Sequence, residues 1–284
     1  ALLVLGDTNS ALSAISAKRL KIPIFHMEAG NRCWDWNVSE MINRKIVDHI
    51  SDINLPYTEN SRRYLLDEGV DGKTIFVTGS PMREVLRDHE QAIEASAVLD
   101  ELELKANKYI LISAHREENI DNEENFMSLM NSINAIAEKY EMPVIYSTHP
   151  RSQKFIDQRQ FKFHPLVQNL KPFGFMDYNK LQKNAYCVLS DSGTLSEESA
   201  MLGFAGVLIR TSTERPEVLD KGTVVIGGIK EQTIEQGIEL AVSMRDNHEE
   251  TVVPFDYNDT NVSIKVCKII QSYYDIVNKT VWNK

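Results

Sequence analysis

A regular alternation of short apolar segments, polar turns and helix-forming segments constrains the fold of this chain more than any other feature. The first apolar segment ends abruptly at Gly6-Asp7-Thr8, and the later ones end in similar polar turns. Strands and helices that alternate at this length form a parallel sheet with helices on both faces. We expect strands at residues 1–5, 22–27, 53–55, 74–78, 109–113, 143–147, 167–170, 185–190, 206–209 and 224–226.

Several helix boundaries are also predicted from the sequence. Ser39, Thr58 and Asp121 each precede a helical pattern and are expected to cap it. The apolar positions of residues 126–140 follow the helical period, and residues 262–277 form a final amphipathic helix.

The length of 284 residues is sufficient for two medium domains with separate cores. Charged and helix-forming residues dominate residues 87–107, which we interpret as the connection between two α/β sheets of similar size. We therefore predict domains at residues 1–92 and 93–258, with the helix of residues 259–284 packing back on the first domain. A chain that opens directly on an apolar strand is typical of the second half of such a sheet. Strands that precede it in the natural protein are expected to be absent here.

Composition and charge exclude several classes of function. A net charge of −10 argues against nucleic acid or an anionic membrane as a partner, and the apolar runs are strand-sized. No signal peptide is expected at Ala1–Leu5, and Cys33, Cys187 and Cys267 follow no metal or redox spacing. Free thiols in the cytoplasm are the expectation. The sequence contains no HExxH, GxGxxG or P-loop motif, so we predict no metal and no cofactor.

The stretch from Cys187 to Glu198 has the pattern of a strand, a polar turn and a helix. Such a unit directs the first N–H groups of the helix, and the positive end of its dipole, toward a phosphate or diphosphate. Gly193 permits close approach of the backbone, and Ser192 and Thr194 add hydroxyl groups. Glu198 lies about one helical turn later, where a carboxylate can bind the two hydroxyls of a ribose. The alternative is a polar turn that binds nothing.

Other polar residues are predicted at the carboxyl ends of strands, where open parallel sheets bind ligands. Asp7, Glu28 and Glu40 belong to the first sheet, and His115 belongs to the second. If the two sheets face each other, these residues line one cleft with the Ser192-Gly193-Thr194 turn. The alternatives are caps or solvated loop residues for the carboxylates and a core histidine for His115.

Two arginines are candidates for binding the anion. Arg215 lies in the run from Thr211 to Glu217 that follows another strand end, and Arg116 follows His115. Guanidinium groups bind phosphates through paired hydrogen bonds, and an acidic protein needs such a local cluster to hold an anionic substrate. The alternative for Arg215 is an ion pair with Glu214 or Glu217.

Seven motifs together resemble the non-hydrolysing UDP-N-acetylglucosamine 2-epimerase family, and they occur in the order found in that family. They are Gly6-Asp7-Thr8, His26 to Gly30, Glu40 to Arg44, His115 to Glu118, Asp191 to Thr194, Glu197-Glu198 and Thr213 to Glu217. The resemblance implies a GT-B-like α/β fold with two Rossmann-like parallel-sheet domains facing a central cleft, the first truncated at its N-terminus.

The resemblance also implies roles for the candidate residues. Asp7, Glu28, Glu40 and His115 correspond to the catalytic groups, and Ser192, Gly193, Glu198 and Arg215 correspond to the groups that hold UDP. Arg116 and Thr194, selected above from the residues themselves, complete the predicted UDP-binding set. The family inverts C2 of a UDP-N-acetyl sugar by eliminating and re-adding UDP through a glycal. Residues 31–49 look most like the branch that makes UDP-N-acetyl-L-fucosamine for bacterial capsule or other surface polysaccharide. A cytoplasmic homodimer is the implied assembly.

Two other functions remain open at the level of sequence. A GT-B glycosyltransferase would also hold a nucleotide diphosphate, but it would need an acceptor site and no group of three carboxylates. A chain that lacks part of its first sheet could instead bind UDP without turnover.

Overall fold

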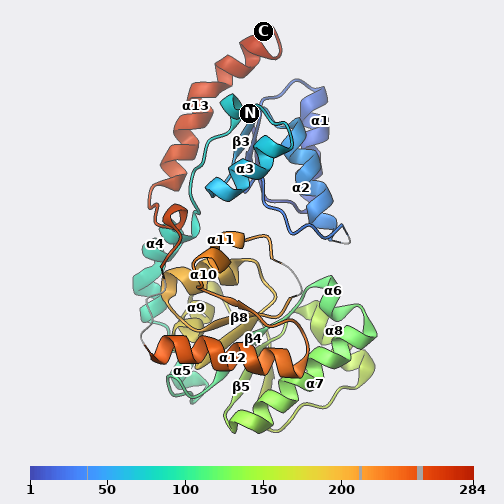
Figure 1. Cartoon of the computed structure of the whole chain (residues 1–284), viewed down its shortest axis with the longest axis vertical. Helices are drawn as coiled ribbons and strands as arrows, with labels where there is room; N and C mark the ends of the chain where they lie inside the picture. The colour runs from blue at the N-terminus through green and yellow to red at the C-terminus, as the bar shows by residue number, and fades with distance from the viewer. Residues whose placement is uncertain (37, 211–212, 248–251) are drawn as a thin grey trace. The chain divides into compact units, whose positions relative to one another are not determined.

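The computed structural model describes residues 1–36, 38–210, 213–247 and 252–284. The chain divides into two compact units, and Figure 1 labels many of their helices and strands. Unit 1 comprises Ala1–Val85, Ser212–Glu217 and Pro254–Lys284, and unit 2 comprises Leu86–Thr211 and Val218–Val253. The domain boundaries predicted from the sequence, at residues 92 and 258, stay predictions beside this division.

Unit 1 contains a three-stranded parallel sheet with the order β1-β2-β3. Its strands are β1 (Leu2–Leu5), β2 (Ile24–Met27) and β3 (Ile53–Leu55). Its helical elements are η1 (Asn9–Leu12), α1 (Ser13–Arg19), α2 (Ser39–Ile50), α3 (Glu59–Asp67), η2 (Gly72–Thr74), η3 (Phe255–Tyr257) and α13 (Val262–Thr280), and α4 (Met82–Glu94) leads into unit 2.

Both faces of the central strand β2 are covered, and successive side chains of this strand point to opposite sides. Ile24 of β2 packs with Val47 of α2 in a core that α1 also joins. Its neighbour Phe25 packs instead with Val262 of α13. The C-terminal helix is therefore part of unit 1, although more than 200 residues separate it from β2 in the sequence.

Unit 2 contains a six-stranded sheet with the order β6-β5-β4-β7-β8-β9, in which every pair is parallel. The strands are β4 (Ile110–Ser113), β5 (Val144–Ser147), β6 (Val167–Leu170), β7 (Cys187–Ser190), β8 (Gly206–Leu208) and β9 (Val225–Ile226). The helices are α5 (Val98–Glu101), α6 (Glu117–Ile120), α7 (Glu123–Tyr140), α8 (Pro150–Arg159), α9 (Phe175–Asn184), α10 (Thr194–Leu202), α11 (Pro216–Asp220, which begins in unit 1) and α12 (Glu231–Asp246).

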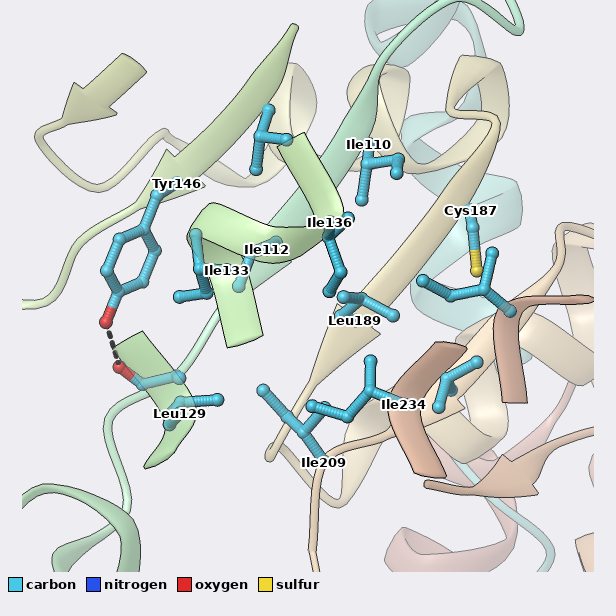
Figure 2. Packing of buried hydrophobic residues seen from close by; sticks show 14 of the residues in the cluster. Ile110, Ile112, Leu129, Ile133, Ile136, Tyr146, Cys187, Leu189, Ile209 and Ile234 are labelled. Atoms are coloured by element: carbon cyan, nitrogen blue, oxygen red, sulfur yellow. Dashed lines mark hydrogen bonds between the residues drawn. The ribbon is translucent and has the colours of Figure 1, made fainter. Parts of the chain in front are cut away.

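The core of unit 2 forms where α7 and α12 pack on the central strands (Figure 2). Ile133 and Ile136 of α7 face Ile112 of β4, and all three side chains are at most 1% exposed. Complete burial of one such side chain contributes about 1.5–3 kcal/mol. This packing holds the carboxyl ends of β4 and β7, which carry the candidate site, in a fixed position.

The predicted α/β class with parallel sheets is confirmed, and Thr58 caps α3 by accepting a hydrogen bond from the Ser61 amide. The prediction of a strand at residues 74–78 is wrong, because Ile75 makes only an isolated bridge to Asn54. The predicted caps Ser39 and Asp121 are also wrong. Val38 and Asn122 occupy the two capping positions, and the Asn122 side chain accepts from the Asn125 amide.

The cysteines are free thiols, as expected, with Cys33 and Cys187 buried and Cys267 exposed. Among the helices in the described ranges, none combines the length and apolar character needed to cross a membrane.

Candidate functional site

The strand order of the unit 2 sheet reverses between β4 and β7. The chain proceeds from β4 to β5 and β6 on one side, and from β7 to β8 and β9 on the other. Ligands of open α/β sheets bind beyond the carboxyl ends of the strands at such a reversal. Ser113 of β4 pairs with Ser190 of β7, so the residues that follow these two serines are neighbours. They include His115 and Arg116 on one side and Ser192 and Gly193 on the other.

Asp191 joins the two turns. Its buried carboxylate accepts hydrogen bonds from the backbone amides of His115 and Arg116, both at 2.9 Å, and from Asn119 at 3.2 Å. The His115 Nδ1 atom lies 3.3 Å from the other carboxylate oxygen, and its side chain is 41% exposed. Asp191 therefore orients His115 toward solvent. Sequence reasoning did not select Asp191, although an acidic residue directly after a central strand is a usable signal.

Helix α10 begins directly after this turn, with Gly193 at its N-cap and Thr194 as its first residue. The first N–H groups of a helix have no partner within the helix and can bind an anion. The hydroxyl groups of Ser192 and Thr194 lie 3.0 Å apart at the same place. The Arg116 Nε atom donates to the Asp191 carbonyl at 3.1 Å, which keeps a cation next to the helix start.

Glu198 lies one turn further along α10 and is 7% exposed. Its Oε2 atom accepts a hydrogen bond from Gln182 of α9 at 2.6 Å. Burial raises the pKa of Glu198 above its ordinary value, and the hydrogen bond from Gln182 opposes the rise. Gln182 thus fixes the position of this carboxylate. No local pattern distinguishes Gln182 from other polar residues of a helix, so sequence reasoning missed it.

The carboxylates of unit 1 form a second candidate group, which we call the unit 1 acidic group (Asp7, Glu28 and Glu40). Asp7 follows β1, Glu28 follows β2 and Glu40 lies in the first turn of α2. A side-chain carbon placed on Gly6 would lie 3.1 Å from the Glu28 Oε2 atom, so the first two turns are in contact. Glu28 itself has a positive φ of 64°, which is uncommon outside glycine.

Two arginines contact this acidic group. Arg44 of α2 forms ion pairs with Asp7 and Glu28, and the second is 3.5 Å long. Arg215 donates a hydrogen bond from Nη2 to the Glu28 Oε1 atom at 3.0 Å, and its guanidinium lies 5.9 Å from the ring of Tyr57. Thr211 and Ser212, which precede Arg215 in the predicted anion-binding run, lie outside the described residues.

The pKa of Asp7 reflects these neighbours. Burial raises the pKa of Asp7 above its ordinary value, and the charge of Arg44 opposes the rise. The surrounding carboxylates add to it, namely Glu28, Glu40 and Glu214. A carboxyl group with a raised pKa that lies near others can serve as either acid or base.

The structure thus brings the candidate residues together in two sets. Asp7, Glu28, Glu40 and Arg215 belong to unit 1, and unit 2 holds His115, Arg116, Ser192, Gly193, Thr194 and Glu198. Within the described part of the chain, no group of three or more His, Cys, Asp or Glu side chains has the arrangement to hold a metal ion.

Comparisons with known proteins show the family to which the chain is related. A family model described as UDP-N-acetylglucosamine 2-epimerase matches residues 1–271. The UDP-N-acetylglucosamine 2-epimerase of Methanocaldococcus jannaschii is 32% identical over 258 residues, which are 86% of this chain and 69% of that protein.

Two solved structures of similar proteins cover nearly the whole chain. The UDP-N-acetylglucosamine 2-epimerase from Rickettsia bellii superposes with a TM-score of 0.90 at 44% identity, over 100% of this chain and 76% of that one. The Methanocaldococcus jannaschii UDP-GlcNAc 2-epimerase in complex with UDP-GlcNAc and UDP has a TM-score of 0.88 at 30% identity, over 95% of this chain and 75% of that one.

Proposed function

The chain belongs to the UDP-N-acetylglucosamine 2-epimerase family, as its motifs predicted, and from this premise we propose that it inverts C2 of a UDP-N-acetyl-hexosamine. The observation that carries the proposal is the reversal of strand order between β4 and β7. His115, Arg116 and the start of α10 all follow these two strands, which is the place where open α/β sheets bind nucleotides.

The proposed reaction is an elimination followed by an addition. The C2 proton of a UDP-sugar is not next to a carbonyl group, so direct removal and return of this proton is too difficult. A base takes the C2 proton as the bond from C1 to the diphosphate oxygen breaks, and C1 and C2 become doubly bonded in a glycal. An acid then delivers a proton to the opposite face of C2, and the diphosphate oxygen adds back to C1.

The unit 1 acidic group supplies the proton transfers in this proposal. Burial raises the pKa of Asp7 above its ordinary value, and a carboxyl group of this kind with other carboxylates beside it can act as acid or base. Arg44 keeps Asp7 and Glu28 next to each other although both can carry negative charge. We assign no single face of the sugar to any one carboxylate.

The groups of unit 2 bind the UDP in this proposal. The N–H groups at the start of α10 and the hydroxyls of Ser192 and Thr194 bind the diphosphate, and Glu198 accepts from the ribose hydroxyls. Donors placed where charge develops on a leaving diphosphate provide a large share of catalysis. His115 assists departure of the diphosphate.

Arg116 and Arg215 add positive charge for the same diphosphate. Arg116 is held next to the helix start by Asp191, and Arg215 contacts Glu28 of the acidic group. A guanidinium that contacts a catalytic carboxylate can exchange that contact for a phosphate oxygen. This exchange would couple binding of the diphosphate to release of Glu28.

The finer parts of the proposal concern the product and the assembly. Residues 31–49 favour UDP-N-acetyl-L-fucosamine as the product, with UDP-N-acetylmannosamine as the second choice, for capsule or another surface polysaccharide. We also propose that the protein works as a homodimer. Size-exclusion chromatography with light scattering tests the assembly, and a monomer at micromolar concentration would contradict it.

Incubation with a panel of UDP-N-acetyl sugars in heavy water, without any acceptor, tests the function. We expect mass spectrometry and NMR to detect a C2 epimer that carries deuterium at C2. A glycosyltransferase would leave the sugar largely intact until an acceptor is added. Binding of UDP in calorimetry without epimer or deuterium would instead indicate a chain that binds UDP and does not turn it over.

A further inference from the structure

A buried ion-pair network connects the turns that carry Asp7 and Glu28, and its centre is Asp48 of α2. Asp48 is 1% exposed. One of its carboxylate oxygens lies 2.8 Å from His26 Nδ1, and the other lies 2.7 Å from an Arg32 Nη2 atom. Both oxygens also accept from the backbone amide of Gly30, at 3.3 and 3.2 Å.

Each contact of Asp48 leads to a turn of the proposed site. The other ring nitrogen of His26, Nε2, lies 2.9 Å from the carbonyl oxygen of Gly6, the residue before Asp7. Gly30 lies two residues after Glu28. The ring of His26 and the carboxylate of Asp48 therefore bridge Gly6, at the start of the turn after β1, to Gly30 in the turn after β2.

Arg32 supports Asp48 from the opposite side. This arginine is 1% exposed and donates from Nε and Nη2 to Glu68, at 3.0 and 2.7 Å. It also donates to the carbonyl of Asn31, whose own side chain donates to Glu28 at 3.2 Å. Buried charges are tolerated when they are paired and hydrogen-bonded, so removal of one member leaves an uncompensated charge.

The turn after β2 needs such support. Glu28 has a φ of 64° and Gly30 has a φ of 80°, and a side-chain carbon at Gly30 would lie 2.4 Å from the Ser61 carbonyl oxygen. Strained backbone of this kind persists only where the surrounding structure fixes it. The amide of Gly30 is fixed by Asp48, which gives Asp48 control of the direction of Glu28.

We propose that Asp48 is a positioning residue for the epimerase reaction, holding the turns of Asp7 and Glu28 together through His26 and Gly30. The inference rests on the proposed function for its effect on turnover. Asp48 acts through the two turns and does not touch the substrate in this proposal, so its replacement is expected to lower kcat. Substrate affinity should change less than kcat, because Asp48 contacts His26, Gly30 and Arg32 of unit 1, whereas α10 belongs to unit 2.

Asp48→Asn tests the proposal with almost no change in volume. Asparagine has one acceptor oxygen where aspartate has two, and it lacks the negative charge that pairs with Arg32, so it cannot hold Arg32, the Gly30 amide and the His26 ring as the carboxylate does. We expect kcat to fall at least tenfold, with KM changed less than threefold. The matched control is Asp52→Asn, because Asp52 is also buried and accepts from the Ile24 amide at 2.9 Å, yet touches neither turn.

A second readout does not depend on turnover. In protein labelled with ¹³C at aspartate, the carboxyl titration of Asp7 reports its distance from Arg44 and from the carboxylates Glu28, Glu40 and Glu214. Separation of the two turns in Asp48→Asn weakens the effect of Glu28, so we expect the pKa of Asp7 to fall relative to Asp52→Asn.

The outcomes separate this inference from the proposed function. If Asp48→Asn and Asp52→Asn have equal kcat values and equal Asp7 titrations, the inference is overturned. If the unchanged chain binds UDP but produces no epimer, the proposed function fails. The titration of Asp7 then tests by itself whether Asp48 holds the two turns together. If Asp48→Asn does not fold, Glu68→Gln takes its place. Glu68 is partly exposed, and this substitution weakens the ion pair between Arg32 and Glu68 while the pair between Arg32 and Asp48 stays. An unchanged kcat and Asp7 titration in that variant would overturn the inference.

Discussion

Replacing Arg44 by methionine removes the cation between Asp7 and Glu28 while keeping much of the apolar stem. Arg44 is 4% exposed, and the side chains of Asp7 and Glu28 are 16% and 18% exposed. Removal of one partner from a buried ion pair costs about 3–5 kcal/mol. Because both carboxylates reach solvent in part, we expect the lower end, a loss of about 3 kcal/mol in the free energy of unfolding.

Tryptophan fluorescence measures the unfolding of unit 1 specifically. The three tryptophans of the chain, Trp34, Trp36 and Trp282, all belong to unit 1, so their fluorescence during urea unfolding reports that unit. This holds even if the two units unfold in separate steps. The control is Arg62→Met, which breaks a partly exposed ion pair with Glu59 at 3.1 Å and should cost less than about 0.5 kcal/mol.

The loss in Arg44→Met should depend on pH with a defined sign. The pKa of Asp7 is already raised by burial, and Arg44 opposes that rise, so the substitution raises the pKa further. A carboxyl group with a raised folded-state pKa favours folding at low pH and loses this advantage as the pH rises. The loss should therefore be larger at pH 8 than at pH 5. Equal losses for Arg44→Met and Arg62→Met, or a loss that grows toward acid pH, would refute the reasoning.

Three further predictions address the site and its support. Glu40→Gln should stop both epimerisation and deuterium uptake at C2 while UDP still binds in calorimetry; unchanged exchange would remove Glu40 from the proton transfers. Gln182→Leu should weaken UDP binding about tenfold, because Glu198 loses its 2.6 Å donor inside the protein, and equal affinity would contradict the role of Gln182. Burial opposes the ionisation of Glu68, but Arg32 and Lys45 outweigh it and lower its pKa to about 2. The Glu68→Gln variant should therefore have a lower free energy of unfolding than the unchanged protein, with the full difference above pH 4.5 and a smaller one as the pH falls toward 2. An equal difference at pH 3 and pH 7 would disprove the lowered pKa of Glu68.

Much of the fold could be predicted from local patterns. The strand expected at residues 53–55 is β3, because a short apolar segment between polar turns has few other solutions. Thr58 caps α3, because its hydroxyl reaches the Ser61 amide within the same turn. The errors at residues 74–78 and at Asp121 have the opposite cause. Ile75 lacks a full set of partners beside β3, and Asp121 pairs with Arg151 of α8 instead of capping α7.

By itself, the sequence determined where most strands end in a polar turn, since such turns depend on neighbours within a few positions. It therefore supplied Asp7, Glu28, His115 and the start of α10 as candidates. Only the tertiary structure decided that β4 lies beside β7, which brings Asp191 to the amide of His115 across 76 residues. It also decided that Asp48 reaches both turns of the acidic group. Pairing of parallel strands and burial of ion pairs depend on packing between distant segments, and no local pattern of residues encodes that packing.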